Sequence, residues 1–263
     1  MSIAQNLAPV DLQPLGAGIA LVTLRRPAAR NAITPQIARL LEKIVTEVEH
    51  SDEIIVAILT GEGDRAFCAG ADLNEVAAGR LDDCFTQAGG FAGFVNAKRS
   101  KPWIAAVNGP ALAGGFEIVL ACDLAVAADT AMFGLPEVKR GLIASAGGLY
   151  RLPRVLPRVL AMEMIATGRP IGAPQALAMG VINRVTTPLD LLEVAKKLAA
   201  EICANAPLAV RESVRIVRAA SGFDDDVLRG DAEAAQAVLQ TTRDYSEGAR
   251  AFLEKRAPQW TGK

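Results

Sequence analysis

The chain has 263 residues, 51% of them hydrophobic and only 5% aromatic, and it is long enough to bury a sizeable core. Its 28 Lys and Arg residues against 29 Asp and Glu residues give a formal net charge of -1. This balance argues against a protein that coats nucleic acid or an anionic membrane. The mean hydropathy is +0.25, and the apolar content comes from Ala, Val, Leu and Ile, which predicts an interior where backbones approach closely.

Targeting and redox signals favour a protein of the cytoplasm. The uncharged stretch over residues 102–116 holds several Gly and Pro residues and is shorter than the roughly 20 apolar residues of a membrane span. Residues 1–10 have no continuous apolar core, so we expect no secretory signal. Four cysteines lie far apart without a CxxC pair: Cys68, Cys84, Cys122 and Cys203. Such spacing favours reduced thiols over disulfides or a zinc site.

The single histidine restricts the possible chemistry. His50 stands at the polar end of a helical pattern, where a cation or polar group suits the helix C-terminus. A Ser-His-Asp or Cys-His hydrolase would have to use this one residue, and a metal site with several histidines cannot be built. We therefore expect chemistry that depends on carboxylates and backbone dipoles.

The first predicted elements alternate between strand and helix. Residues 18–24 form an apolar run that predicts a buried strand. Thr34 is a candidate N-cap before Pro35, and apolar residues at helical spacing predict an amphipathic helix that ends near His50. Residues 54–60 predict the next strand. This order indicates a right-handed crossover between two parallel strands.

The alternation continues through the middle of the chain. We expect a helical region over residues 81–98, a strand over 103–107, a buried helix over 115–121 and a strand over 124–127. The rest of the chain is predicted to be mostly helical, over residues 156–167, 174–179, 187–205, 207–220 and 224–255. The pattern predicts an α/β core over residues 1–190 and a helical C-terminal region over residues 191–263.

Three segments place Gly and Ala beside the ends of strands: residues 67–73, 111–117 and 133–137. Ligands of open α/β sheets bind beyond the carboxyl ends of strands, so a site is expected in the loops that follow Thr60 and Val107. Neither loop carries GxGxxG or GxxxxGK[ST], which argues against dinucleotide and nucleoside triphosphate sites.

Gly114 and Gly115 stand at the predicted start of the buried helix. Free N–H groups and the helix dipole favour an oxyanion there. A second N–H from the region of Ala71 would complete a two-donor oxyanion hole, in which each donor contributes roughly 3 to 4 kcal/mol. Close packing of helix on sheet through glycine is the alternative explanation.

Two glutamates follow these segments. Glu117 enters the first turn of an otherwise apolar helix, a setting that should raise its pKa toward a value useful for acid or base catalysis. Glu137 follows Pro136 at a second predicted helix start. Each could instead be a helix-start glutamate that the dipole favours, but two glutamates beside two candidate oxyanion donors make a coherent site.

Seven groups of segments cover nearly the whole chain: residues 26–32, 67–73, 101–109, 113–117 with 122–123, 133–137, 168–171 with 176–181, and 247–256. Together they resemble the crotonase (enoyl-CoA hydratase/isomerase) superfamily. The resemblance implies a crotonase (ClpP-like) α/β spiral of ββα units, with a helical C-terminal region for trimerisation. It also implies an acyl-CoA thioester substrate and a homotrimer, or a hexamer formed as a dimer of trimers.

The resemblance assigns roles to the candidate residues. The N–H groups of Ala71 and Gly114 would form the oxyanion hole for the thioester carbonyl. Glu117 would act as the base on water, and Glu137 would deliver a proton to Cα. Further residues would bind coenzyme A: Ala69, Gly70, Asp72 and Leu73 on the pantetheine and adenine side, Ala29 near the nucleotide, and Phe252 and Lys255 from a neighbouring subunit.

These observations predict a 2-enoyl-CoA hydratase of fatty acid metabolism and β-oxidation that uses no metal and no redox cofactor. An enoyl-CoA isomerase or a specialised dehydratase on the same site stays open, because Ala113, Ala144 and Ser145 depart from the usual hydratase pattern. A non-catalytic or RNA-binding homologue is the competing class. The predicted helix over residues 35–50 offers only Arg39 and Lys43 as cations, which argues against RNA.

Overall fold

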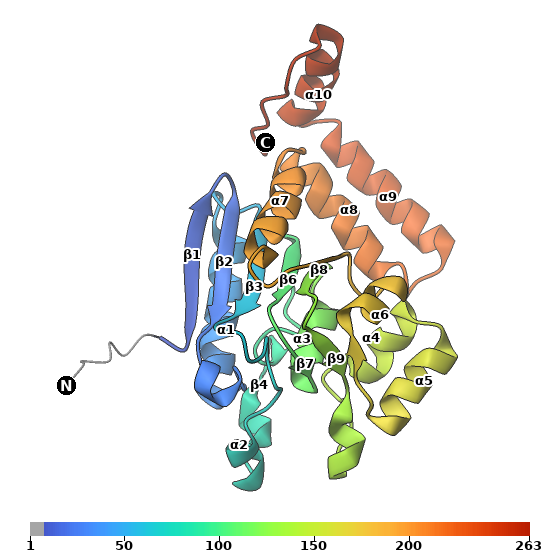
Figure 1. Cartoon of the computed structure of the whole chain (residues 1–263). Helices are drawn as coiled ribbons and strands as arrows, with labels where there is room; N and C mark the ends of the chain where they lie inside the picture. The colour runs from blue at the N-terminus through green and yellow to red at the C-terminus, as the bar shows by residue number, and fades with distance from the viewer. Residues whose placement is uncertain (1–7) are drawn as a thin grey trace, which may run out of the picture.

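The computed structural model describes residues 8–263 and is built around a six-stranded sheet in the order β1-β2-β3-β6-β8-β11 (Figure 1). β1 is antiparallel to β2, and the other neighbouring pairs are parallel. A smaller sheet has the order β10-β9-β7, and β4 pairs with β5. The strands are β1 Val10–Gly16, β2 Ile19–Leu24, β3 Val56–Gly61, β4 Phe85–Thr86, β5 Gly90–Phe91, β6 Trp103–Val107, β7 Ala111–Leu112, β8 Leu124–Ala128, β9 Met132–Gly134, β10 Ile171–Gly172 and β11 Arg184–Thr186.

Helices pack on both faces of the main sheet. The helices of the described part of the chain are α1 Pro35–His50, α2 Leu73–Ala77, α3 Gly114–Ala121, α4 Gly148–Val155, α5 Arg158–Thr167, α6 Ala173–Ala178, α7 Leu191–Cys203, α8 Pro207–Ala219, α9 Asp225–Leu239 and α10 Arg243–Glu254. Short 3-10 helices occupy Pro27–Ala29, Leu81–Cys84 and Pro136–Arg140.

The predicted crossover from β2 through α1 to β3 is confirmed. The Thr34 hydroxyl accepts a hydrogen bond from the Ile37 N–H at 3.4 Å, and Pro35 begins the helix. The ring of His50, in the last turn, lies 2.7 Å from the Thr46 carbonyl oxygen. β2 and β3 run parallel in register from Ile19 to Leu24. Local capping and apolar spacing therefore predicted this unit correctly.

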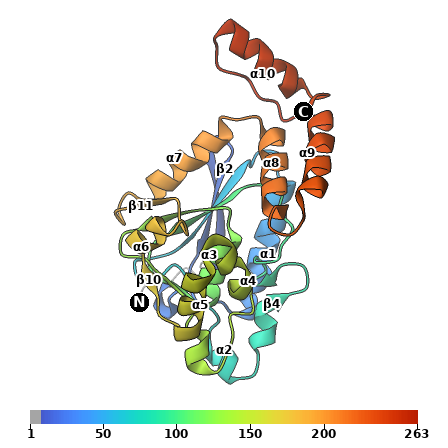
Figure 2. The ribbon, with the colours of Figure 1, turned by 90° about the vertical axis from the view of Figure 1, so that its right-hand side faces the viewer.

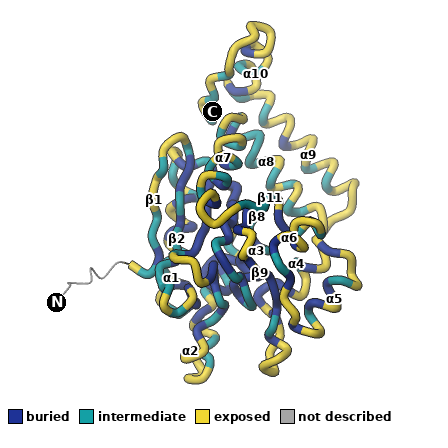
Figure 3. Tube along the Cα trace, viewed as in Figure 1, coloured by how far each residue is buried: buried dark blue, intermediate teal, exposed yellow. Residues whose placement is uncertain are grey.

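Successive residues of β3 point to opposite faces of the sheet and are buried on both. Ala57 and Leu59 pack with α1 and α3 on one face, whereas Val56 and Ile58 pack with α7 on the other. Figure 2 shows the helices around the sheet, and Figure 3 shows the central strands as the most buried part of the chain. Cover on both faces explains why the central strands read as continuous apolar runs.

The predicted helical region over residues 81–98 is wrong. The segment contains a 3-10 turn, the short β4-β5 hairpin and further turns. Gly90, Ala92 and Gly93 have φ values of 65°, 57° and 66°, outside the helical region. A Cβ on Gly93 would lie 2.2 Å from the Ala38 carbonyl oxygen of α1. Close contact with α1 therefore overrides the local apolar pattern.

The C-terminal residues divide into two parts. α7 packs on the sheet through Leu191, Ala195 and Ala199, whereas α8, α9 and α10 extend away from it (Figures 1 and 2). The stretch predicted as helical over residues 224–255 is two helices, because the chain turns after α9 and Thr242 caps α10. Arg218 of α8 holds this extension to the core through an ion pair of 2.7 Å with Asp123.

Within residues 8–263, no helix is both long and apolar enough to cross a bilayer. Residues 1–7, which belong to the segment where the sequence predicts no secretory signal, lie outside the described part.

Candidate active site

A cavity of about 550 Å³ opens where the loop after β3 meets the start of α3 and the 3-10 helix Pro136–Arg140. Most of the predicted site residues line it: Ala29, Ala69, Ala71, Asp72, Leu73, Gly114, Glu117 and Glu137. These residues come from segments up to 108 positions apart in the sequence. The parallel sheet brings them together because its strands end at a common edge.

The loop after β3 presents the Ala71 N–H to the cavity side. The Gly70 carbonyl accepts from the Ile33 N–H at 2.8 Å, and the Asp72 N–H donates to the Ile33 carbonyl at 2.8 Å. Both contacts lie on the side of Ile33, so the intervening Ala71 N–H points to the opposite side. Among the described residues it has no backbone acceptor.

The start of α3 approaches this loop closely. A Cβ on Gly70 would lie 3.0 Å from the Gly114 backbone nitrogen, and one on Gly114 would lie 2.4 Å from the Phe91 ring. Gly114 is the first residue of α3, where N–H groups have no partner within the helix. The N–H groups of Ala71 and Gly114 therefore belong to adjacent walls of one cavity, as a two-donor oxyanion hole requires.

Ala113, just before α3, has φ 52° and ψ -131°, a conformation that residues with a side chain rarely adopt. Its N–H donates to the Gly134 carbonyl at 2.9 Å, and its carbonyl accepts from the Glu117 N–H at 3.1 Å. These contacts hold the sharp turn from β7 into α3. The turn presents Gly114 to the cavity at the cost of local strain.

Glu117 lies in the first turn of α3, and only 3% of it is exposed. Its Oε1 accepts a hydrogen bond of 2.9 Å from the Gly148 N–H. Burial, and then the charge of Glu137, raise the pKa of Glu117 to about 7, against the lowering effects of Gly148 and Arg151. A carboxyl group with this pKa can take up and release a proton near neutral pH.

Glu137 lies in the 3-10 helix Pro136–Arg140 and is 8% exposed. Its Oε2 is buried without a hydrogen-bond partner among the described residues. Burial raises the pKa of Glu137, while its own N–H and Arg140 act in the opposite direction. An unpaired buried carboxyl oxygen beside a cavity is available to a ligand.

The structure leaves three predicted residues off the cavity wall. Gly70 lies directly behind it, with φ 89°, and sets the direction of Ala71. Phe252 and Lys255 lie in and just after α10, at the opposite end of the molecule from α2 (Figures 1 and 2). They do not reach the cavity of their own chain. Their assignment to a neighbouring subunit's site stays a prediction.

Several wall residues were missed by sequence reasoning. Phe85 and Phe91 of the β4-β5 hairpin form an aromatic wall, with ring centroids 5.4 Å apart. The sequence gives no signal for this wall, because the pattern over residues 81–98 predicts a helix and not the hairpin that pairs the two rings. Arg140 also lines the cavity. Ser145, singled out as a departure from the hydratase pattern, lines it too, but Ala144 does not.

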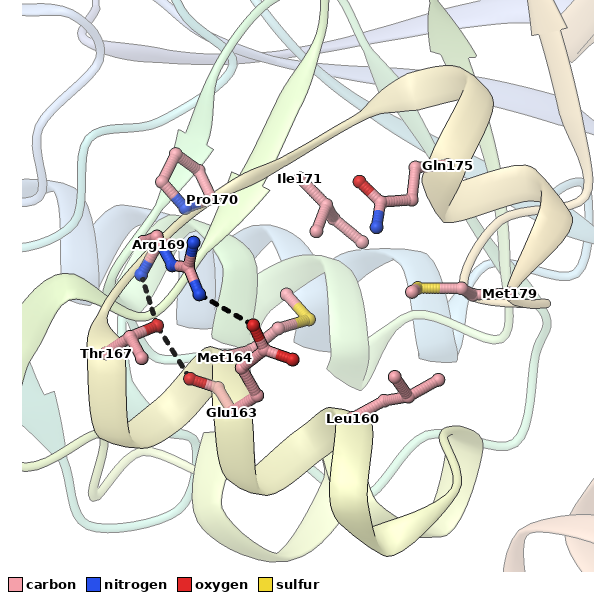
Figure 4. A pocket seen from close by; sticks show the side chains of 9 residues that line it. All are labelled: Leu160, Glu163, Met164, Thr167, Arg169, Pro170, Ile171, Gln175 and Met179. Carbon is pink, nitrogen blue, oxygen red and sulfur yellow. Dashed lines mark hydrogen bonds and ion pairs between the residues drawn. The ribbon is translucent and has the colours of Figure 1, made fainter.

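A second cavity of about 180 Å³ lies between α5, β10 and α6 (Figure 4). Its carboxylate, Glu163, is in an ion pair of 2.6 Å with Arg169, and both side chains are largely exposed. The remaining walls are mainly apolar, and the cavity has no pair of buried carboxyl groups. It offers no comparable acid and base.

The other reactive side chains contribute little to the chemistry. Burial raises the pKa of the Cys68 thiol to about 12, so it is not a thiolate at neutral pH. Across residues 8–263, no three His, Cys, Asp or Glu side chains gather in a way that would hold a metal ion. Glu117, Glu137 and the free N–H groups are the candidate reactive groups of this cavity.

The sequence matches the model of the enoyl-CoA hydratase/isomerase family over residues 15–263. A Bacillus subtilis (strain 168) protein, YngF, provisionally named an enoyl-CoA hydratase/isomerase, is 42% identical over 249 residues, 93% of this chain and 95% of that protein. The carnitinyl-CoA dehydratase of Escherichia coli (strain SMS-3-5 / SECEC) is 40% identical over 248 residues, 92% of this chain and 94% of that protein.

Solved structures agree with these matches. The enoyl-CoA hydratase of Mycobacterium tuberculosis H37Rv superposes with a TM-score of 0.92 at 40% identity, over 98% of this chain and 100% of that chain. The enoyl-CoA hydratase EchA1 of Mycobacterium marinum superposes with a TM-score of 0.93 at 40% identity and the same coverage. The predicted α/β fold class and family resemblance are confirmed. The chain therefore belongs to the enoyl-CoA hydratase/isomerase family of the crotonase superfamily.

Proposed function

We propose that the protein adds water to a 2-enoyl-CoA to give a 3-hydroxyacyl-CoA. The observation that carries the proposal is the pair of buried glutamates, Glu117 and Glu137, on the wall of one cavity with the free N–H groups of Ala71 and Gly114. Enzymes of the family act on acyl-CoA thioesters, which agrees with this arrangement. No other described cavity offers an acid, a base and an oxyanion hole together.

In the proposed reaction the thioester carbonyl oxygen accepts hydrogen bonds from the Ala71 and Gly114 N–H groups. These donors stabilise the negative charge that develops when a nucleophile adds to Cβ. The carbonyl thereby serves as the electron sink. Because the substrate itself takes up the electrons, the reaction needs no metal and no redox cofactor.

The two glutamates divide the proton transfers. Ionised Glu117 takes a proton from water as the water oxygen bonds to Cβ, and the π electrons of the Cα–Cβ bond move toward the carbonyl. Protonated Glu137 then delivers a proton to Cα, which restores the thioester carbonyl. One water is added in all. Transfer of a proton from Glu117 back to Glu137, through solvent, returns the site to its starting state.

We propose that the two ends of such a substrate lie against different walls of the cavity. We assign the coenzyme A arm to the side of Ala29, Ala69 and Leu73, where the two alanines carry only a methyl group and the Leu73 side chain is largely exposed. The acyl chain then extends toward Phe85 and Phe91. Asp72 also lines the cavity, and its ion pair of 3.0 Å with Arg26 compensates its charge.

Dehydration is the second candidate, because carnitinyl-CoA dehydratases are among the relatives at 40% identity. Elimination of water from a 3-hydroxyacyl-CoA is the reverse of hydration and would use the same two glutamates. Carnitine carries a trimethylammonium group, which aromatic faces can bind. The Phe85 and Phe91 wall is the corresponding feature here. Because carnitinyl-CoA dehydratases are among the relatives, a place in β-oxidation stays a prediction.

The test is turnover of defined thioesters by the purified protein. Crotonyl-CoA and longer 2-enoyl-CoAs are followed by loss of the conjugated thioester absorbance, and carnitinyl-CoA by its gain. Hydration of the enoyl-CoAs supports the proposal. Turnover of carnitinyl-CoA alone would favour the dehydratase, and migration of the double bond without water uptake would favour an isomerase. No turnover, together with RNA binding in a gel shift at physiological salt, would indicate the non-catalytic class.

We further propose a homotrimer, alone or paired into a hexamer, in the cytoplasm. Large apolar side chains stay exposed on and between α8, α9 and α10: Val217, Phe223, Val227, Val238, Phe252 and Leu253. Phe252 is 83% exposed, which a surface in water would not favour. Light scattering should give a mass three or six times that of the 27.6 kDa chain, and a monomer would contradict the proposal.

A further inference from the structure

Arg151, in the first turns of α4, joins three separate parts of the structure. Its Nη1 donates to the Ala146 carbonyl oxygen at 3.0 Å. Its Nη2 donates to the Val95 carbonyl oxygen at 2.5 Å and lies 3.3 Å from Asn96 Oδ1. The guanidinium therefore bridges the turn before α4 and the segment after β5.

The turn that Arg151 holds leads directly to the candidate base. Gly147 has φ 125°, and a Cβ there would lie 1.8 Å from Arg151 Nη1, so the guanidinium lies against a bare backbone. The Gly147 carbonyl accepts from the Arg151 N–H at 2.8 Å. The next residue, Gly148, donates its N–H to Glu117 Oε1 at 2.9 Å. One side-chain bond, from Nη1 to the Ala146 carbonyl, and one backbone bond, from the Arg151 N–H to the Gly147 carbonyl, thus hold the turn that presents this N–H.

The charges around Glu117 come from two other elements. Glu137, in the 3-10 helix, raises the pKa of Glu117, and Arg151, in α4, lowers it. Arg140 acts on Glu137 from the same 3-10 helix. Arg154 and Tyr150 are the neighbours of Arg151 on α4. Arg151 is therefore the cation that favours the ionised state of Glu117, both by its charge and by the N–H it orients.

We propose that Arg151 is a positioning residue that keeps the Gly148 N–H on Glu117 and the base ready to accept a proton from water. This inference rests on the proposed hydratase reaction. A merely structural tie between α4 and the segment around Val95 would predict lower stability when Arg151 is replaced. It would not predict a change in the ionisation of Glu117.

Arg151→Met and Arg151→Lys separate the two roles of the guanidinium. Methionine removes the charge and the side-chain hydrogen bonds but keeps the backbone N–H that donates to the Gly147 carbonyl. Lysine keeps a charge but cannot bridge two carbonyl groups as a planar fork does. The matched control is Arg154→Met, one turn along α4, because Arg154 is exposed and donates no side-chain hydrogen bond to any described residue. Melting temperatures confirm that each variant is folded.

For Arg151→Met we expect kcat for 2-enoyl-CoA hydration to fall about 10- to 100-fold, with KM changed by less than about threefold. In the plot of kcat against pH, the acid limb should move to higher pH by about one unit, because Glu117 has lost a nearby cation and a well-oriented hydrogen-bond donor. In Arg151→Lys, kcat should also fall, but the acid limb of the plot should move by less. If Arg151→Met matches Arg154→Met in kcat and acid limb, or Arg151→Lys matches wild type, the proposal is wrong.

A titration that needs no turnover separates this inference from the proposed function. Protein labelled with 13C at the glutamate carboxyl carbon is titrated, and the Glu117 signal is assigned by its loss in Glu117→Gln. The pKa of Glu117 should be higher in Arg151→Met than in wild type or Arg154→Met. An unchanged pKa would overturn the positioning role. Absence of hydration by wild type would contradict the proposed function and leave this measurement valid.

Discussion

The Gly148 N–H donates a hydrogen bond of 2.9 Å to Glu117 Oε1, across 31 positions of the sequence. The bond favours the ionised carboxylate, whereas burial at 3% exposure and the nearby Glu137 favour the protonated acid. Burial outweighs the hydrogen bond, and the pKa rises to about 7. Because burial and the hydrogen bond act in opposite directions, the pKa of Glu117 lies near neutral pH, where the carboxyl group can both accept and release a proton.

Glu117→Gln should reduce kcat for hydration by roughly 100-fold or more, because an amide cannot take a proton from water. In wild type, kcat should fall as the pH drops below about 7 and Glu117 becomes protonated. Steady-state kinetics between pH 5 and 9 measure both effects. Glu163→Gln is the control, because it removes an exposed carboxylate paired with Arg169. Equal rates in the two variants would show that Glu117 is not the base.

Glu137→Gln should also slow hydration by roughly 100-fold or more, for a different reason. The variant lacks the proton for Cα, so the rate at which solvent deuterium enters Cα should fall along with turnover. Mass spectrometry of reactions in D2O, sampled over time, measures this rate. A wild-type rate of incorporation in the variant would assign proton delivery to another group.

Glu117→Gln should make the folded protein more stable at high pH. The pKa of Glu117 rises from 4.5 to about 7 on folding, so the folded state binds the proton more tightly than the unfolded state. In wild type, the contribution of Glu117 to the free energy of unfolding is therefore greatest below pH 4.5, and it is lost as the pH rises to about 7. Glutamine avoids that loss, so the variant should gain roughly 1 to 3 kcal/mol at pH 8 and little at pH 5.

Denaturant unfolding at these two pH values measures the difference in the free energy of unfolding. A gain that is the same at pH 5 and pH 8 would mean that the glutamine stabilises through packing, and not through the titration of Glu117.

Gly114→Ala should damage catalysis while leaving the protein folded. The new Cβ would lie 2.4 Å from the Phe91 ring, so the start of α3 or the ring must move, and the Gly114 N–H moves with it. Loss of one oxyanion donor lowers kcat by about 100- to 1000-fold, and a displaced donor should approach that loss. Gly172→Ala is the matched control, because its Cβ finds only Pro174 at 3.8 Å. Similar kcat values for both variants would exclude Gly114 from the oxyanion hole.

Ala113→Gly should stabilise the fold. Ala113 has φ 52° and ψ -131°, which costs a residue with a Cβ about 1 to 3 kcal/mol and costs glycine little. Glycine also increases the conformational entropy of the unfolded state, which lowers stability by roughly 0.5 to 1 kcal/mol. The free energy of unfolding should therefore rise by about 1 kcal/mol in all. The melting temperature should rise. A fall would show that packing of the Ala113 methyl group stabilises the fold by more than the backbone strain destabilises it.

Local signals accounted for the parts of the fold that depend on neighbouring residues. The Thr34 cap, Pro35 and the apolar spacing predicted the start of α1 at Pro35 and its end near His50, because capping and amphipathicity act over a few turns. The same reasoning failed over residues 81–98. There Gly93 touches the Ala38 carbonyl of α1, a contact between segments that no local pattern reports.

The candidate site shows the same division. The sequence by itself identified Glu117 and Glu137 as carboxylates in apolar segments, and Gly114 as a helix start, because each of these is a local property. Their convergence on one cavity, the aromatic wall of Phe85 and Phe91, and the Arg151 contacts were decided only by the tertiary structure. The burial of a carboxyl group, and therefore its pKa, depends on which distant segments pack around it. The residues next to that group in the sequence do not contain this information.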